Sequence, residues 1–229
     1  MGYTRRLLSP KYYKVSRKSH KFIVTTIPGP YGKDKSIPIA VALRDILKIA
    51  DNIHEVRHIL SKKAVKIDNK IQTNFKFPIG FMDVLTINNE NYRVLVNEKG
   101  LYIKPIDSNQ AKLKLLKIVR KCYVKNNKLQ LSFHDGRTLL VEKDMYKTGD
   151  VVLFDLETKQ IKQQTQFKRG AMILITEGRN KGKLGVIEDM VIIRGSQPNK
   201  IIVKTGTEKI ETLKDYTFVL GQDTSLINM

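Results

Sequence analysis

Residues 37–71 read IPIAVALRDILKIADNIHEVRHILSKKAVKIDNKI, and the hydrophobic spacing changes within this stretch. From Ile39 to Ala50 the apolar residues recur at helical spacing and define one face. Asn52 followed by Glu55 three residues later is a capping-box pattern, with Asn in place of Ser or Thr. The sequence therefore predicts two short helices joined by a tight turn.

The pattern after residue 64 is typical of strands. Val65 and Ile67 alternate with lysines, and Asp68-Asn69 predicts the turn of a hairpin. Residues 75–88 predict a further strand pair that bends near Pro78. Two helices followed by strands within about 60 residues have the size of a small RNA-binding module.

The remainder of the chain is rich in alternating patterns. Between residues 92 and 167 short apolar runs recur every 8–12 residues or so, which indicates a small barrel or curled sheet. Residues 170–203 are again strand-rich. The expected fold class is α+β, mostly β. The expected parts are a basic N-terminal extension (1–36), an RNA-binding module (37–99), a central β domain (100–168) and a C-terminal β domain (169–229).

The N-terminal segment is the most basic part of the chain, with seven Lys or Arg and no Asp or Glu in residues 1–21. Like charges repel and few apolar residues are available, so we expect this arm to become ordered only when it docks on a polyanion. Tyr3, Tyr12 and Tyr13 lie among the cations and are expected to stack on bases. The alternative is a solvated tail without a specific role.

The whole chain has 42 Lys plus Arg against 22 Asp plus Glu, a net charge of +20. Self-repulsion of this size opposes folding, so the charge indicates a polyanionic partner, with nucleic acid first and an anionic membrane surface second. A membrane partner is disfavoured because the chain has no run of about 18 apolar residues and no long basic amphipathic helix.

The loop GRNKGKLG at residues 178–185 places cations between glycines. It has neither the Walker spacing nor the helix that follows a nucleotide-binding loop. We expect a hairpin loop that contacts the RNA backbone through Arg179, Lys181 and Lys183; the alternative is a solvated turn.

Nothing in the sequence indicates an enzyme. His54 and His58 are four residues apart but have no third metal ligand nearby in the sequence, and no nucleophile elbow or dinucleotide-binding turn is present. We expect no catalytic residue, metal, cofactor or small-molecule substrate. The single Cys122 and an N-terminus unlike a secretory signal predict an intracellular, reducing location.

Several stretches resemble known families. Residues 37–71 resemble the ribosomal-type helical RNA-binding module that also occurs in pseudouridine synthases and tyrosyl-tRNA synthetases, with Lys63 and Asn69 where that module often has glycine. Residues 170–187 resemble a KOW motif. The order of these modules is similar to the e-type small-subunit ribosomal protein four family of archaea and eukaryotes, as are TNFKFPIGFMDVLTI (73–87), HDGRT (134–138), TGDVVLFDLETKQI (148–161), RRLLSPKYY (5–13) and IPGPYG (27–32).

The resemblance implies a structural component of the small ribosomal subunit in the cytoplasm, with 16S-type rRNA and neighbouring ribosomal proteins as partners. It also implies a central barrel-like domain and a C-terminal SH3-like KOW barrel. The expected RNA-binding residues are Arg5, Arg6, Lys11, Lys14, Arg17, Lys18, Lys21, Arg44, Lys48, Arg57, Lys62, Lys63, Lys66, Arg179, Lys181 and Lys183. The alternatives are an RNA-modifying enzyme and a KOW-containing transcription factor.

Overall fold

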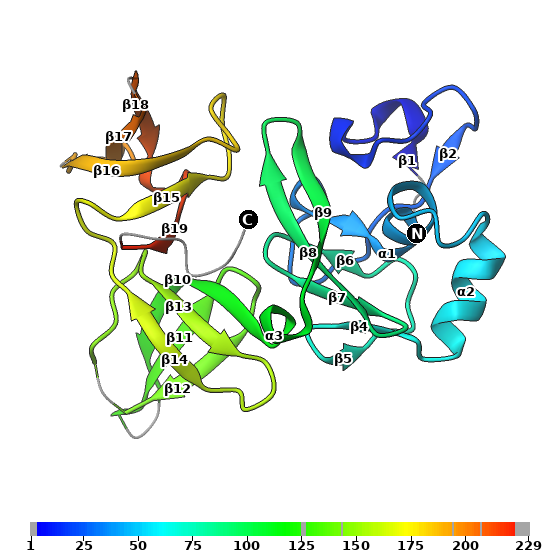
Figure 1. The fold of residues 1–229 in the computed structure, drawn as a ribbon. Helices are drawn as coiled ribbons and strands as arrows, with labels where there is room; N and C mark the ends of the chain where they lie inside the picture. Colours follow the sequence, from blue (N-terminus) through cyan, green and yellow to red (C-terminus); the bar gives the residue numbers. More distant parts are fainter. Residues whose placement is uncertain (1–3, 125–126, 143, 194, 207, 223–229) are drawn as a thin grey trace. The chain divides into compact units, whose positions relative to one another are not determined.

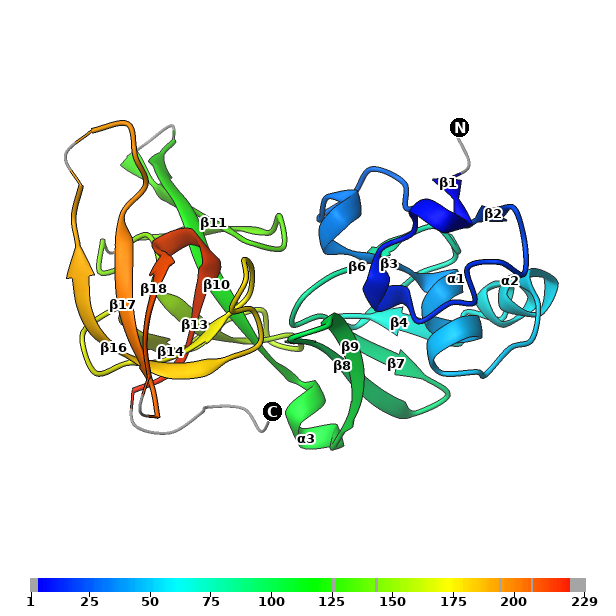
Figure 2. The same cartoon turned by 90° about the horizontal axis from the view of Figure 1, so that it is seen from above.

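The structure is a computed structural model that describes residues 4–124, 127–142, 144–193, 195–206 and 208–222. The chain divides into two compact units, Met1–Lys114 and Leu115–Met229. Each contains antiparallel sheets, and the helical segments of the described residues are short (Figures 1 and 2). The expected α+β, mostly β class is confirmed.

The first unit contains a five-stranded sheet in the order β5-β4-β7-β8-β9, together with a separate pair formed by β3 and β6. The predicted hairpin is confirmed, because Asp68 and Asn69 both have positive φ between its strands. The strands are β3 (Ile37–Pro38), β4 (Val65–Ile67), β5 (Lys70–Ile71), β6 (Pro78–Ile79), β7 (Val84–Ile87), β8 (Glu90–Asn97) and β9 (Gly100–Ile106).

Two helical segments pack on this sheet. α1 (Ile39–Val41) continues into a π-helical turn (Ala42–Ile46), and α2 spans Ile53–Ser61. The Asn52 side chain accepts hydrogen bonds from the backbone N–H groups of His54 and Glu55 at 2.9 and 3.0 Å. The Glu55 carboxylate in turn accepts a hydrogen bond from the backbone N–H of Asp51 at 2.8 Å. In the usual capping box this donor is the N–H of the N-cap residue, which here is Asn52.

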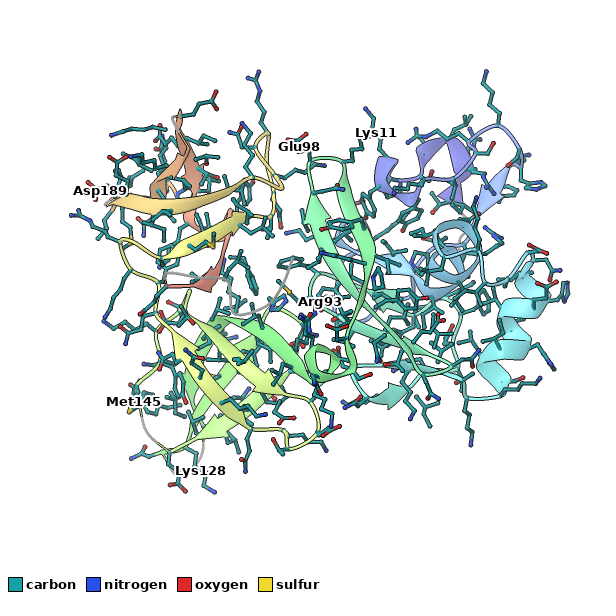
Figure 3. All side chains as sticks on the ribbon, in the orientation of Figure 1. Lys11, Arg93, Glu98, Lys128, Met145 and Asp189 are labelled. Atoms are coloured by element: carbon teal, nitrogen blue, oxygen red, sulfur yellow. The ribbon has the colours of Figure 1, made fainter. Side chains whose placement is uncertain are left out.

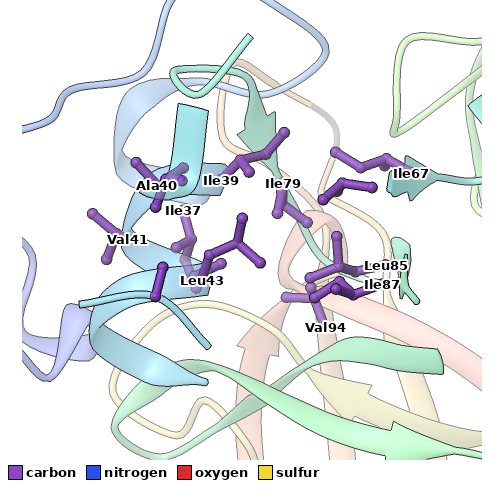
Figure 4. Packing of buried hydrophobic residues seen from close by; sticks show 14 of the residues in the cluster. Ile37, Ile39, Ala40, Val41, Leu43, Ile67, Ile79, Leu85, Ile87 and Val94 are labelled. Atoms are coloured by element: carbon purple, nitrogen blue, oxygen red, sulfur yellow. The ribbon is translucent and has the colours of Figure 1, made fainter. Parts of the chain in front are cut away.

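The core of the first unit lies between these helices and the sheets. Figure 4 shows the side chains of the first helical segment facing those of β4, β6, β7 and β8. The predicted apolar face is therefore buried as expected: Ile39, Leu43, Val56 and Leu60 are all at most 1% exposed. Burial of this kind is the main source of the folding free energy.

The N-terminal arm is folded onto this core, so the expectation that it orders only on docking is wrong for the described residues from Thr4 onward. β1 (Thr4–Arg5) pairs with β2 (Phe22–Ile23), and Tyr13 is 3% exposed within the core. Arg6 is buried and donates to the carbonyl of Ser16. Buried tyrosine and isoleucine supply apolar contacts, and most of the cations point outward.

The 3₁₀ turns of the N-terminal part are Arg6–Leu8, Lys11–Tyr13 and Lys33–Lys35.

The second unit contains two five-stranded antiparallel sheets, in the orders β12-β11-β10-β13-β14 and β18-β17-β16-β15-β19. The strand-rich character predicted for residues 92–167 and 170–203 is confirmed. α3 (Ser108–Ala111), which precedes β10, belongs to the first unit. The strands of these sheets are β10 (Leu113–Tyr123), β11 (Leu129–Phe133), β12 (Thr138–Val141), β13 (Val151–Asp155), β14 (Ile161–Thr165), β15 (Met172–Ile175), β16 (Leu184–Val191), β17 (Lys200–Thr205), β18 (Glu208–Leu213) and β19 (Thr217–Gly221), with a 3₁₀ turn (Lys214–Tyr216) before β19.

Two sequence-based expectations differ from the structure. The strands within 75–88 do not pair with each other, because β6 pairs with β3 while β7 lies between β4 and β8. The expected boundary between residues 99 and 100 falls inside the β8–β9 hairpin, where Asn97 pairs with Gly100. Strand pairing therefore keeps residues 100–106 with the first unit.

A buried ion cluster joins distant parts of the first unit. The Lys114 ammonium is fully buried and lies 2.7 Å from an Asp68 carboxylate oxygen and 2.6 Å from one of Asp83. Asp83 also accepts from the Tyr31 hydroxyl at 2.6 Å and the Gly80 N–H at 2.8 Å. Burial raises the pKa of Asp83 to about 6, although the Lys114 charge opposes that shift.

Arg93 is also fully buried, and its charge interacts with that of Asp68 in this cluster. Its guanidinium donates to the carbonyls of Gln110 and Leu113 at 2.7 and 2.6 Å, which fixes α3 and the start of β10. Burial lowers the pKa of Arg93 to about 10. Charged side chains thus attach the segment that follows β9 to the rest of the first unit.

We predict that Lys114→Met costs about 3–5 kcal/mol in the free energy of unfolding, because it leaves two buried carboxylates without their cation. The loss should shrink between pH 7 and 5. Without the Lys114 charge, which lowers the pKa of Asp83, folded Asp83 binds a proton over this range that unfolded Asp, with a pKa of about 3.9, does not. Urea unfolding at both pH values measures this, with exposed Lys99→Met as the control. A loss below 1 kcal/mol contradicts the role assigned to Lys114.

A second prediction concerns the arm. Tyr13→Ala should destabilise the protein by about 3–5 kcal/mol, because it empties a core position, whereas truncation of the half-exposed Phe22 should cost less than about 1 kcal/mol. Thermal unfolding of both variants makes the comparison. Equal stability of Tyr13→Ala and the wild type would show that the arm is not packed in solution.

Candidate nucleic-acid interface

Most predicted RNA-binding residues of the first unit are exposed cations without an acidic partner. None of eleven such residues makes an ion pair within the described part of the chain, and all except the half-buried Arg17 are exposed. Figure 3 shows Lys11 of this set pointing away from the ribbon. They are Arg5, Lys11, Lys14, Arg17, Lys18, Lys21, Lys48, Arg57, Lys62, Lys63 and Lys66.

Two predicted residues have internal roles instead. Arg44 donates to the Asp45 carboxylate at 2.7 and 3.2 Å, and Arg6 lies 3.8 Å from the other oxygen of the same group. Only 8% of the Arg6 side chain and 20% of the Arg44 side chain are exposed. These two arginines therefore bring the arm and the first helical segment together around Asp45, which sequence spacing did not reveal.

The predicted stacking tyrosines are not available for bases. Tyr13 is buried, and the hydroxyls of Tyr12 and Tyr13 both donate to the carbonyl of Ser36, at 3.2 and 3.1 Å. Desolvation raises the pKa of both hydroxyls well above the usual value for tyrosine. The stacking prediction is wrong for these two residues, and Tyr3 lies outside the described residues.

An aromatic residue that the sequence analysis did not select lies beside the predicted cations. The Phe75 ring is half-buried, and the Arg57 guanidinium carbon lies 4.8 Å from its centroid. The available sequence signal was an aromatic residue followed directly by Lys76 in a loop, but its proximity to α2 depends on the fold.

Three of the candidate lysines have a left-handed backbone: Lys14, Lys48 and Lys63 have φ of 50°, 55° and 56°. This conformation is uncommon for residues with a side chain beyond glycine, and it costs about 1–2 kcal/mol. Lys63 and Asn69 both have positive φ, in agreement with the glycine that the resembling module often has there. The lysine at position 63 thus adds a cation where glycine suits the backbone better.

In the second unit, the loop 177–183 connects β15 and β16 as a hairpin loop, as predicted. The Gly182 N–H donates to the Ile175 carbonyl at 2.7 Å and closes the loop. Arg179 is exposed and Lys181 is half-exposed, and neither makes an ion pair in the described residues. Lys183 differs, because its ammonium lies 3.7 Å from a Glu208 carboxylate oxygen.

The two units differ in how their charge is compensated. Met1–Lys114 has 22 Lys or Arg against 9 Asp or Glu, a net +13, whereas Leu115–Met229 has 20 against 13, a net +7. On the second unit, cations such as Lys200 and Lys209 pair with Glu211 and Glu188 at 2.9 and 2.6 Å. Unpaired positive charge is thus greatest on the first unit.

The described residues contain no group of three or more His, Cys, Asp and Glu side chains that suits a metal ion. Among them, no helix has the length and apolar character needed to cross a membrane.

Comparison with known proteins gives the family. A sequence profile described as Ribosomal family S4e matches residues 88–161. Small ribosomal subunit protein eS4 of Methanothermobacter thermautotrophicus is 40% identical over 229 residues, which cover 98% of this chain and 94% of the relative. The eS4 protein of Archaeoglobus fulgidus is 40% identical over 223 residues, with 96% and 94% covered. This chain belongs to the S4e family of ribosomal proteins.

A solved member of the S4e family has the same fold. The crystal structure of the 30S ribosomal protein S4e from Thermoplasma acidophilum has a TM-score of 0.72 and 33% sequence identity, and the match covers 83% of this chain and 97% of that one. The resemblance that the sequence motifs indicated is confirmed. The relatives named here are ribosomal proteins, and none is an enzyme or a transcription factor.

We predict opposite effects of Lys63→Gly on stability and RNA affinity. Relief of the left-handed backbone should raise the free energy of unfolding by about 0.5–1 kcal/mol, while the lost cation should weaken binding and lower the salt slope by about one. The control is Lys62→Gly, where φ is −72° and glycine should only destabilise. Unchanged RNA affinity of Lys63→Gly would exclude this lysine from the interface.

Proposed function

We propose that this protein is a structural component of the small subunit of the cytoplasmic ribosome, where it binds 16S-type rRNA and neighbouring ribosomal proteins. The observation that carries the proposal is the set of exposed cations on the first unit that lack an internal acid, in a member of a ribosomal protein family. Such a surface is most stable when an external polyanion neutralises it.

The binding mechanism is electrostatic and geometric. Lysine and arginine side chains neutralise phosphates and release the counterions condensed on the RNA. Because the arm is already folded onto the core through Tyr13 and the β1–β2 pair, its cations are held in place before RNA arrives. Preorganisation of this kind lowers the entropic cost of binding.

We also propose an assignment of modules. The helices and hairpin of residues 37–71 support a ribosomal-type RNA-binding module with its contacts at Lys48, Arg57, Lys62, Lys63 and Lys66. The sheet from Leu113 to Thr165 supports a central barrel-like domain. The sheet from Met172 to Gly221, with the loop carrying Arg179, Lys181 and Lys183, supports an SH3-like KOW barrel.

The salt dependence of binding tests the mechanism. If about eight phosphates are neutralised, the slope of log affinity against log salt for a small-subunit rRNA transcript should lie between roughly −5 and −7. Filter binding or fluorescence anisotropy between 50 and about 300 mM KCl measures it. A slope near zero rejects the electrostatic mechanism.

A charge-matched comparison tests where the interface lies. Lys62→Gln/Lys66→Gln removes two exposed cations that have no acid partner, so affinity should fall about tenfold or more and the salt slope should fall by about two. Lys200→Gln/Lys209→Gln removes the same charge where Glu211 and Glu188 already compensate it, and affinity should fall less than about threefold. The reverse order of effects would place the interface on the second unit.

A further inference from the structure

Two cations lie close to one aromatic ring in the first unit. α2 supplies Arg57, and the loop between β5 and β6 supplies Phe75 and Lys76. The Arg57 guanidinium carbon and the Lys76 ammonium lie 4.8 and 5.6 Å from the centroid of the Phe75 ring. Both distances fall within the range of a cation–π interaction, in which the negative face of the ring attracts a positive charge.

The loop that carries the ring is fixed on both sides. The Phe75 carbonyl accepts from the N–H of Ala40 at 2.9 Å, and the Lys76 carbonyl accepts from the N–H of Ile27 at 3.1 Å. The Asn74 side chain accepts from the N–H of Lys76 at 2.9 Å. The Phe75 ring itself packs against the hydrophobic core. Backbone and ring are thus held by α1, by the segment that follows the arm, and by the core.

Two like charges beside one ring repel each other, and Arg57 has no carboxylate within ion-pair distance in the described residues. Anionic groups bound at the two cations remove that repulsion. Arginine offers a planar fork that matches the two non-bridging oxygens of one phosphodiester, and lysine offers a compact charge for a neighbouring phosphate. Each phosphodiester carries one negative charge, so successive phosphates of an RNA backbone match the two cations.

We propose that Phe75 is a positioning residue that holds Arg57 and Lys76 as a two-cation receptor for the phosphate backbone of RNA. This proposal rests on the proposed rRNA-binding function and gives it a specific site. The ring restricts the two long side chains before RNA binds, so less conformational entropy is lost in the complex. Phe75 acts through the cations and does not itself read a base.

A double-mutant cycle on the full-length protein tests this proposal, with a small-subunit rRNA transcript as the probe. Phe75→Met keeps an apolar side chain but removes the π face, and it should lower affinity threefold to tenfold or so. In the Arg57→Gln background the same change should lower affinity by less than about twofold, because one of the two cations that the ring positions is gone and only Lys76 remains. Phe75→Tyr, which keeps the ring, should restore affinity to nearly that of the wild type.

Arg57→Lys tests the proposal without altering the ring. It keeps the charge but loses the planar fork, and it should weaken binding threefold or so while the salt slope stays unchanged. The proposal is overturned if Phe75→Met lowers RNA affinity equally in the wild-type and Arg57→Gln backgrounds. It is also overturned if neither single variant, Phe75→Met or Arg57→Lys, lowers RNA affinity. Both outcomes leave the proposed rRNA binding intact. Failure of the wild type to bind the transcript would instead reject the proposed function.

Discussion

Three carboxylates of the first unit are held by cations inside or partly inside the unit, and these pairs determine which charged side chains remain free at its surface. Asp68 and Asp83 enclose Lys114, and Asp45 holds Arg6 and Arg44. Burial of a charge costs least when the charge is paired and hydrogen-bonded. These pairs take three acids and three cations away from the surface together, so they do not change its net charge. The surface of the unit is positive because the unit has 22 Lys or Arg against 9 Asp or Glu.

Local signals in the sequence predicted the local elements of the fold. The Asn52–Glu55 cap lies within a few residues of the groups it bonds, and the Asp68-Asn69 turn joins two strands that are adjacent in the sequence, so both patterns are readable without the fold. The β15–β16 hairpin was predictable for the same reason. Its turn glycines and flanking alternation all lie within residues 170–187.

Contacts between distant residues were not predictable in this way. Lys114 is 46 and 31 positions from its carboxylate partners, and Tyr13 bonds a carbonyl 23 positions away. The charge density of the arm predicted disorder, because composition does not show that Tyr13 and Ile23 enter an existing core. Charge and residue type identified candidate cations such as Lys62 and Arg57. Only the fold separates these from Arg6 and Arg44, which have internal partners.

The central claim is that unpaired cations on the first unit face rRNA, and crosslinking in purified small subunits tests it most directly. Ultraviolet crosslinks between protein and RNA, mapped to peptides by mass spectrometry, should concentrate in residues 4–21 and 48–76. Crosslinks confined to residues 115–229, or the absence of this protein from small subunits, would contradict the account.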